Sequence, residues 1–133
     1  MKCDIIYKKY LKIWRKHVTF NFDKEFHFIM QKHDLNTVII LGHLNPDGDA
    51  AGSVMGLAHY IKVNYPQYRV LPYLSDTLDK GPKKQVITDM VFYPFEKPDV
   101  KENYAVIVCD TAVLLRMIGR EYYEGAEASI VID

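Results

Sequence analysis

Short, unbroken runs of apolar residues recur along the chain and predict four strands. Residues 37–41 and 104–109 are rich in β-branched side chains, which is typical of strands buried on both faces of a parallel sheet. Residues 68–74 and 129–132 form the other two runs. Stretches with helical spacing separate the strands, and this alternation predicts an α/β domain with a mainly parallel sheet and helices on both of its faces.

Four further stretches show the periodicity of amphipathic helices. One runs from about residue 23 to 33, with Asn21 or Asp23 as its N-cap. Another covers about 49–64 and places Val54, Leu57, Ala58 and Ile61 on one face. Residues 85–92 predict a short helix after the break at 81–82, and residues 113–123 predict a last helix that stops near Gly125.

The N-terminal segment has a different composition. Residues 1–20 carry six Lys or Arg but only one acid, Asp4. Ile6, Tyr10, Ile13 and Trp14 recur at helical spacing, which predicts a basic amphipathic helix. Such a helix packs on the domain or extends from it, or it binds a membrane surface or a partner. We therefore expect a helical extension over residues 1–21 and one domain over residues 22–133.

Composition narrows the setting of the protein. The chain has 133 residues, enough for one domain with a core, and 17 basic against 17 acidic residues. This balance does not demand nucleic acid or an anionic membrane as a partner. Cys3 and Cys109 form no metal-type pair, and no apolar stretch is long enough to span a membrane. We expect a cytoplasmic protein without a membrane partner.

Acidic residues follow three of the predicted strands. His43, Asp47 and Asp49 come after the first strand, Asp110 after the third and Asp133 after the fourth. The carboxyl ends of parallel strands share one edge, where ligands of open α/β sheets bind. Carboxylates gathered there would repel one another unless cations neutralised them. The pattern predicts one or two divalent metals; carboxylates alone would suit Mg²⁺, whereas a histidine among them favours Mn²⁺, Fe²⁺, Co²⁺ or Zn²⁺.

Structural explanations compete for each of these residues alone. Asn-Pro-Asp-Gly is a common turn, in which Gly48 tolerates positive φ, and Asp49 could be a plain N-cap. Gly52 and Ser53 are expected to let the following helix lie close to the sheet. Asp110 could equally cap the next helix, and Cys109 is expected to be a buried core thiol. The functional interpretation depends on the recurrence of acids at one end of several strands.

Three segments resemble the motifs of a known family. Residues 43–53, read His-Leu-Asn-Pro-Asp-Gly-Asp-Ala-Ala-Gly-Ser and continued by 54–57, resemble the first motif of DHH phosphoesterases. Residues 106–112 resemble the second motif, with Arg116 where many members have an arginine, and residues 130–133 resemble the strand that leads into the Asp-His-His triplet. The resemblance covers about residues 22–133. It implies a Rossmann-like sheet, and it is greatest to the oligoribonuclease and phosphoadenosine-phosphate phosphatase branch.

The resemblance also implies a role for each site residue. His43 and Asp47 would hold one Mn²⁺, Asp49 would hold a second, and Asp110 would be shared between them. Mg²⁺ or Co²⁺ could replace Mn²⁺. Asp133 would orient neighbouring groups, so that the catalytic set is Asp47, Asp49, Asp110 and Asp133. Two metals would activate water for attack on the phosphoester of a short RNA or of 3'-phosphoadenosine 5'-phosphate.

The chain departs from the family pattern after Asp133. Neither histidine of the triplet follows, nor does the family's C-terminal substrate-binding domain. The resemblance therefore implies a truncated chain that is inactive alone, with an exposed apolar surface that favours self-association, a homodimer included. Three alternatives stay open. They are a non-catalytic metal- or nucleotide-binding domain, a cyclic-dinucleotide phosphodiesterase of the same family, and a receiver domain phosphorylated on Asp110. Against the receiver domain, this chain lacks the acidic pair and the lysine that receivers need.

Overall fold

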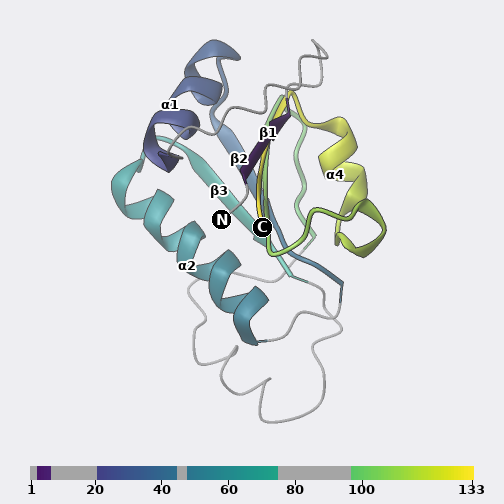
Figure 1. Cartoon of the computed structure of the whole chain (residues 1–133). Helices are drawn as coiled ribbons and strands as arrows, with labels where there is room; N and C mark the ends of the chain where they lie inside the picture. Colours follow the sequence, from purple (N-terminus) through teal and green to yellow (C-terminus); the bar gives the residue numbers. More distant parts are fainter. Residues whose placement is uncertain (1–2, 7–20, 45–47, 75–96) are drawn as a thin grey trace.

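The computed structural model describes residues 3–6, 21–44, 48–74 and 97–133 (Figure 1). Strands alternate with helices through most of these residues. In chain order the elements are β1 (Cys3–Ile6), α1 (Phe22–Lys32), β2 (Thr37–Leu41), α2 (Gly48–Asn64), β3 (Arg69–Tyr73), β4 (Ala105–Cys109), the 3₁₀ helix η1 (Leu114–Arg116), α4 (Arg120–Gly125) and β5 (Ala128–Ile132). The predicted helix at 85–92 lies outside the described residues.

The strands form one sheet in the order β1-β5-β4-β2-β3. β3, β2, β4 and β5 are parallel, whereas β1 pairs antiparallel with β5 and places Cys3 opposite Ile132. The predicted strands at 37–41, 104–109 and 129–132 are therefore neighbours with the same direction. The mainly parallel α/β sheet predicted from the alternation of strands and helices is confirmed.

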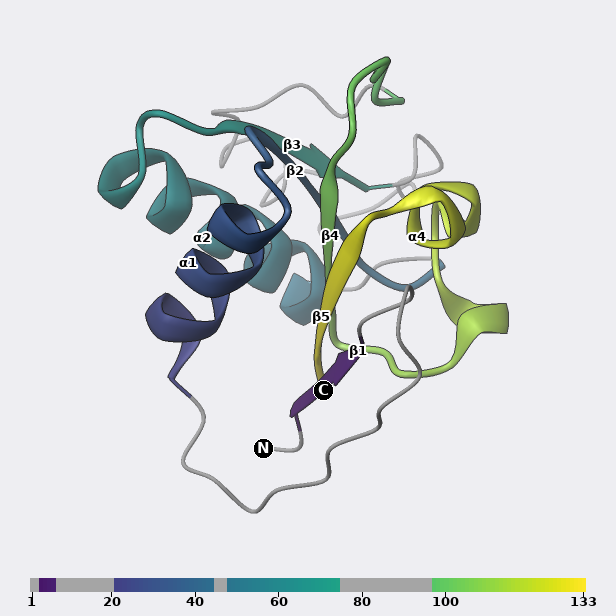
Figure 2. The same ribbon diagram turned by 90° about the horizontal axis from the view of Figure 1, so that it is seen from above.

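Helices cover both faces of the sheet, as predicted. α1 and α2 lie on one face and α4 on the other (Figure 2). Successive residues of β2 point to opposite faces, so Val38 and Ile40 join the core under α1 and α2, while Ile39 and Leu41 join the core under α4. Because both faces are covered, every residue of β2 and of β4 is buried, which explains their unbroken apolar runs.

α2 approaches the sheet closely at its N-terminal half, but not through the residues that we expected. Gly52 and Gly48 have open space where a Cβ would stand, and Ser53 is exposed. The close approach is on the other side of the contact. A Cβ on Gly42, just after β2, would stand 3.3 Å from the Cγ2 of Val54. Gly48 is the first residue of α2 and does not have a positive φ.

An aromatic cluster joins α1 to the C-terminal end of α2. Asn21 caps α1, as predicted, by accepting a hydrogen bond from the backbone N–H of Lys24 at 3.0 Å. Two residues later, Asp23 accepts hydrogen bonds from the hydroxyls of Tyr60 and Tyr65 at 2.8 Å and 2.5 Å. Phe26 lies beneath them and is fully buried. These contacts hold two helices together far from the carboxyl edge of the sheet.

The prediction of a helix through residues 1–20 is wrong for Cys3–Ile6, which form strand β1. The physical reason is tertiary: β5 offers an unpaired backbone edge, and pairing with it outweighs the weak helical spacing of so short a segment. Residues 7–20, which include Tyr10, Ile13 and Trp14, lie outside the described residues. No helix among the residues that the structure describes is long and apolar enough to cross a membrane.

The single helix predicted over 113–123 is also wrong. The segment divides into η1, an extended residue Met117, and α4. Gly119 separates the two helices with a φ of 62°, and a Cβ there would stand 3.0 Å from both Tyr73 and Tyr122. The backbone conformation and the crowding together require glycine at this point. Before Gly119 the chain pairs with residues 42–44, directly after β2, which a continuous helix would prevent.

Candidate metal centre at the carboxyl edge of the sheet

The topology marks one place on the sheet for a ligand. From β2 the chain crosses through α2 to β3 on one side, and β4 then returns to the other side of β2. The connection after β2 covers one face and the connection after β4 covers the opposite face. Such a switch of direction opens a crevice at the carboxyl ends of the two strands, and ligands of open α/β sheets bind there. His43 follows β2, and Asp110 follows β4.

His43 and Asp110 lie close together at this switch point. The imidazole Nε2 of His43 lies 3.5 Å from the Oδ2 of Asp110. The other ring nitrogen, Nδ1, lies 2.7 Å from the carbonyl oxygen of Leu44. A carbonyl oxygen only accepts, so Nδ1 carries the proton of this bond and the Nε2 of the neutral ring carries a lone pair. In that neutral form both facing atoms have lone pairs, which is the form of the pair that can coordinate a cation.

The backbone of Asp110 is held in an unusual conformation. Its N–H continues the sheet by donating to the carbonyl of Ile132 at 2.8 Å, yet its φ is 62°. Non-glycine residues rarely adopt this left-handed region, and such strain gathers at functional sites. Just beyond, the hydroxyl of Thr111 accepts from the backbone N–H of Val113 at 3.2 Å and stabilises the turn. The strained residue therefore ends the strand and leaves its half-exposed carboxylate at the crevice.

The other predicted site residues, three ligands or orienting acids, are placed less completely. Asp49 is an exposed residue in the first turn of α2, and Asp133 directly follows β5 at the same edge. Asp47 lies outside the described residues. Within the described parts of the chain, no group of three or more His, Cys, Asp and Glu is close enough to hold a metal. The structure thus brings together His43 and Asp110, and the rest of the ligand set stays a prediction.

Cys109 is a core thiol, as predicted from its position in the apolar run. It is buried, it forms no disulfide, and burial together with the adjacent Asp110 carboxylate raises its pKa to about 12. Its thiol therefore stays protonated at neutral pH. A protonated thiol is a poor metal ligand, because the thiolate is the form that binds metals. Cys109 packs behind the site and leaves His43 and Asp110 as the pair that faces the crevice.

The segment that supports His43 was not predictable from the sequence. Gly42, His43 and Leu44 run antiparallel to residues 116–118, and His43 forms a β-bridge with Met117. Met117 and Ile118 are buried against the sheet. No periodicity could reveal a pairing between two irregular segments so far apart. The only available sign was Gly119, whose position inside a predicted helix marks a place where the backbone turns.

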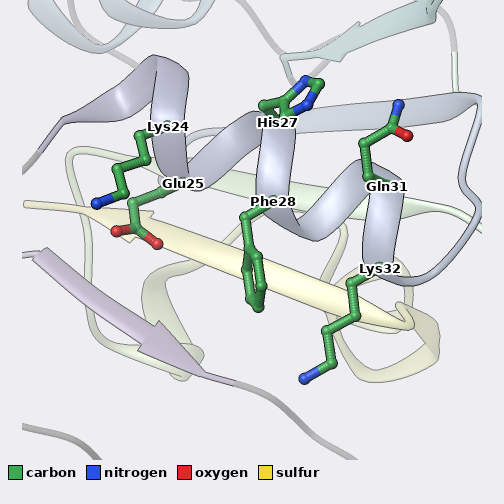
Figure 3. A pocket seen from close by; sticks show the side chains of 6 residues that line it. All are labelled: Lys24, Glu25, His27, Phe28, Gln31 and Lys32. Atoms are coloured by element: carbon green, nitrogen blue, oxygen red, sulfur yellow. The ribbon is translucent and has the colours of Figure 1, made fainter.

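A separate hollow lies on the outer side of α1. Figure 3 shows the six side chains that line it, Lys24, Glu25, His27, Phe28, Gln31 and Lys32. Phe28 is 45% exposed, and the ammonium of Lys32 lies 5.3 Å from the centre of its ring. All six belong to one helix, and none belongs to the carboxyl edge of the sheet. This hollow is therefore distinct from the His43–Asp110 crevice.

Comparison with known proteins agrees with the fold. Residues 37–133 match the model of the DHH family, N-terminal domain, which is well over half of the chain. No curated protein matches the chain. The matched region begins at β2 and contains His43, Asp49, Asp110 and Asp133.

Proposed function

This chain belongs to the DHH family, whose members are phosphoesterases, and we propose that it supplies the metal-binding edge of a manganese-dependent phosphoesterase. The proposed substrates are short oligoribonucleotides, 3'-phosphoadenosine 5'-phosphate, or both. One observation carries the proposal: the Nε2 of His43 faces a carboxylate oxygen of Asp110 at 3.5 Å at the switch point of the sheet. The proposed substrates and the free thiol of Cys109 both suit a reducing cytoplasm.

The donor atoms fit a divalent transition metal. Nδ1 of His43 donates to the Leu44 carbonyl, and metal-bound histidines characteristically make such a bond with their second nitrogen. Nitrogen and carboxylate oxygen together favour Mn²⁺ over Mg²⁺, which prefers oxygen alone. In the proposal His43, Asp47 and Asp110 hold one ion, and Asp49 and Asp110 hold a second.

A bound metal of this kind acidifies a water molecule and neutralises charge on the phosphoryl oxygens. The protein's own groups have distinct tasks. His43 and Asp110 would bind the metal, and the hydrogen bond to the Leu44 carbonyl keeps the imidazole in one tautomer. Asp49 lies at the N-terminal end of α2, where the helix dipole stabilises negative charge, on the carboxylate or on a phosphate. Asp133, which follows β5, orients neighbouring groups at the same edge.

Metal binding is the direct test. The free-ion signal of Mn²⁺ in electron paramagnetic resonance falls as the ion binds, so a titration gives the affinity of the whole chain. We expect His43→Ala and Asp110→Asn each to weaken Mn²⁺ binding by about tenfold or more, because each removes a ligand. Asp34→Asn is the matched control: Asp34 is also an exposed acid with positive φ, but it precedes β2, at the opposite edge of the sheet. Equal affinity in all four proteins would overturn the proposed site.

The substrate is tested separately, by release of nucleotide or phosphate in the presence of Mn²⁺. Dinucleotides, adenosine bisphosphate and a cyclic dinucleotide are offered in parallel. Hydrolysis of the first two, lost in Asp110→Asn and retained in Asp34→Asn, supports the proposal. Hydrolysis of the cyclic dinucleotide alone would move the chain to another branch of the family. Mn²⁺ binding that depends on His43, without hydrolysis of any of the three compounds, would support the metal centre but not the proposed substrates.

A further inference from the structure

Two backbone hydrogen bonds bracket His43. The N–H of Leu44 donates to the carbonyl of Arg116 at 2.6 Å, and the N–H of Ile118 donates to the carbonyl of Gly42 at 3.0 Å. His43 itself forms the bridge between them with Met117. The two bonds thus make a short antiparallel ladder, in which His43 and Met117 are the pair that exchanges no hydrogen bond and whose side chains lie closest.

The segment that pairs with residues 42–44, residues 116–118, is itself packed into the core. Met117 and Ile118 pack into the core on the α4 face, together with Leu41 and Val108. Gly119 follows, with its φ of 62° and with side chains crowding the position where a Cβ would stand. The segment therefore has little freedom to shift along or away from the sheet.

On the other side of the ladder lies His43, which belongs to no helix and to no named strand. β2 ends at Leu41, and α2 begins at Gly48. His43 lies in this short stretch, and its ring is held at Nδ1 through the carbonyl of Leu44. Leu44 is in turn fixed through its bond to Arg116. The direction of Nε2 toward Asp110 therefore depends on the ladder.

We propose that residues 116–118 are a positioning device for His43, and that the ladder sets the affinity of the His43–Asp110 pair for a divalent cation. The inference rests on the proposed function, because it assumes that this pair binds the metal. It adds that residues which donate nothing to the metal, Met117 and Ile118, determine whether it binds well. Loss of groups that orient a ligand typically weakens metal binding by about 10- to 100-fold.

The test removes one hydrogen bond and leaves every proposed ligand in place. Ile118→Pro deletes the N–H that donates to Gly42. The preceding residue, Met117, has φ −81° and ψ 131°, the conformation that a residue before proline prefers. Ile118→Val is the matched control, because it keeps the N–H and a β-branched apolar side chain. We expect Ile118→Pro to weaken Mn²⁺ binding by about tenfold, and Ile118→Val by less than about threefold.

A second readout separates positioning from general damage to the fold. The ¹⁵N shifts of the His43 ring, assigned with the His43→Ala protein, report its tautomer without metal. In the wild type and in Ile118→Val they should show a proton on Nδ1 alone, and in Ile118→Pro a mixture of tautomers. Circular dichroism verifies that each variant is folded.

The outcomes distinguish this inference from the proposed function. If the wild type binds Mn²⁺ through His43 but folded Ile118→Pro binds equally well with an unchanged tautomer, the ladder does not position His43. If His43→Ala leaves Mn²⁺ binding unchanged, the proposed site itself fails. Should Ile118→Pro not fold, Gly119→Ala decides, because its Cβ displaces the segment while both N–H donors remain. Unchanged affinity and tautomer in Gly119→Ala would then overturn the inference.

Discussion

The left-handed backbone of Asp110 leads to a prediction with an unusual sign. In regular helices and strands, a protein with glycine is less stable than the same protein with alanine by about 0.5–1 kcal/mol, because glycine loses more conformational freedom on folding. At a φ of 62° the alanine Cβ is strained, at about 1–2 kcal/mol. The difference leaves Asp110→Gly more stable than Asp110→Ala by about 1 kcal/mol. Both variants remove the same carboxylate, so its loss cancels from the comparison.

Asp34 provides the control for the backbone effect. Its φ is 51°, and it lies in the turn between α1 and β2. Asp34→Gly should also exceed Asp34→Ala by about 1 kcal/mol. Ser53, exposed within α2, provides the ordinary case, where the glycine variant should be less stable than the alanine variant by about 1 kcal/mol.

Urea unfolding without metal, followed by circular dichroism, gives all six free energies. Mn²⁺ titrations of the same proteins should show binding lost in both Asp110 variants and kept in both Asp34 variants. The reasoning is refuted if alanine equals or exceeds glycine at residue 110 while the other two positions behave as expected. In that case the backbone of Asp110 would not carry the strain that is inferred from its φ.

Three further predictions concern parts of the molecule away from the site. Phe26→Ala should lose about 3–5 kcal/mol in urea unfolding, because Phe26 is fully buried and stacks on Phe22 at 5.4 Å between ring centres; a loss below about 1 kcal/mol would contradict its place in the core. The hydrogen bond to Asp23 raises the pKa of Tyr65 to about 12, so NMR of labelled tyrosine should show a late ionisation of Tyr65, which Asp23→Ala brings back toward 10; stability from this bond should be full below pH 10 and decline through pH 12. Deleting residues 1–6 exposes the edge of β5 and should increase self-association in analytical ultracentrifugation, with an unchanged monomer as the contrary result.

The strands and most helices were predictable because their signals are local. The run at 37–41 needs burial on both faces wherever it lies, and Asn21 caps α1 within one turn. Cys3–Ile6 was misjudged because the residues suit a strand or a helix equally, and the partner that decides, β5, lies at the far end of the chain. The helix expected over 113–123 failed for the same reason, since pairing with residues 42–44 overrides its local preference.

For the site, the sequence predicted which residues end the strands, and the structure shows His43 beside Asp110. The strand order was not predictable, because an apolar run does not indicate which strand it will pair with. That order makes β2 and β4 adjacent and places the crevice between them. The positive φ of Asp110 also escaped notice, because aspartate after a strand suggests a helix cap as readily as a strained turn.

The pairing of β1 with β5 has a consequence for the order of folding. Cys3 lies opposite Ile132, so β1 and β5 lie side by side (Figure 1). This is the most distant contact in the sheet, so its closure carries the largest loss of chain entropy. A ribosome releases residues 3–6 first, but their partner emerges only after every other described strand. Among the described strands, β1 is therefore synthesised first but can pair only after β5 is synthesised, and until then the growing domain exposes the edge that β1 will cover.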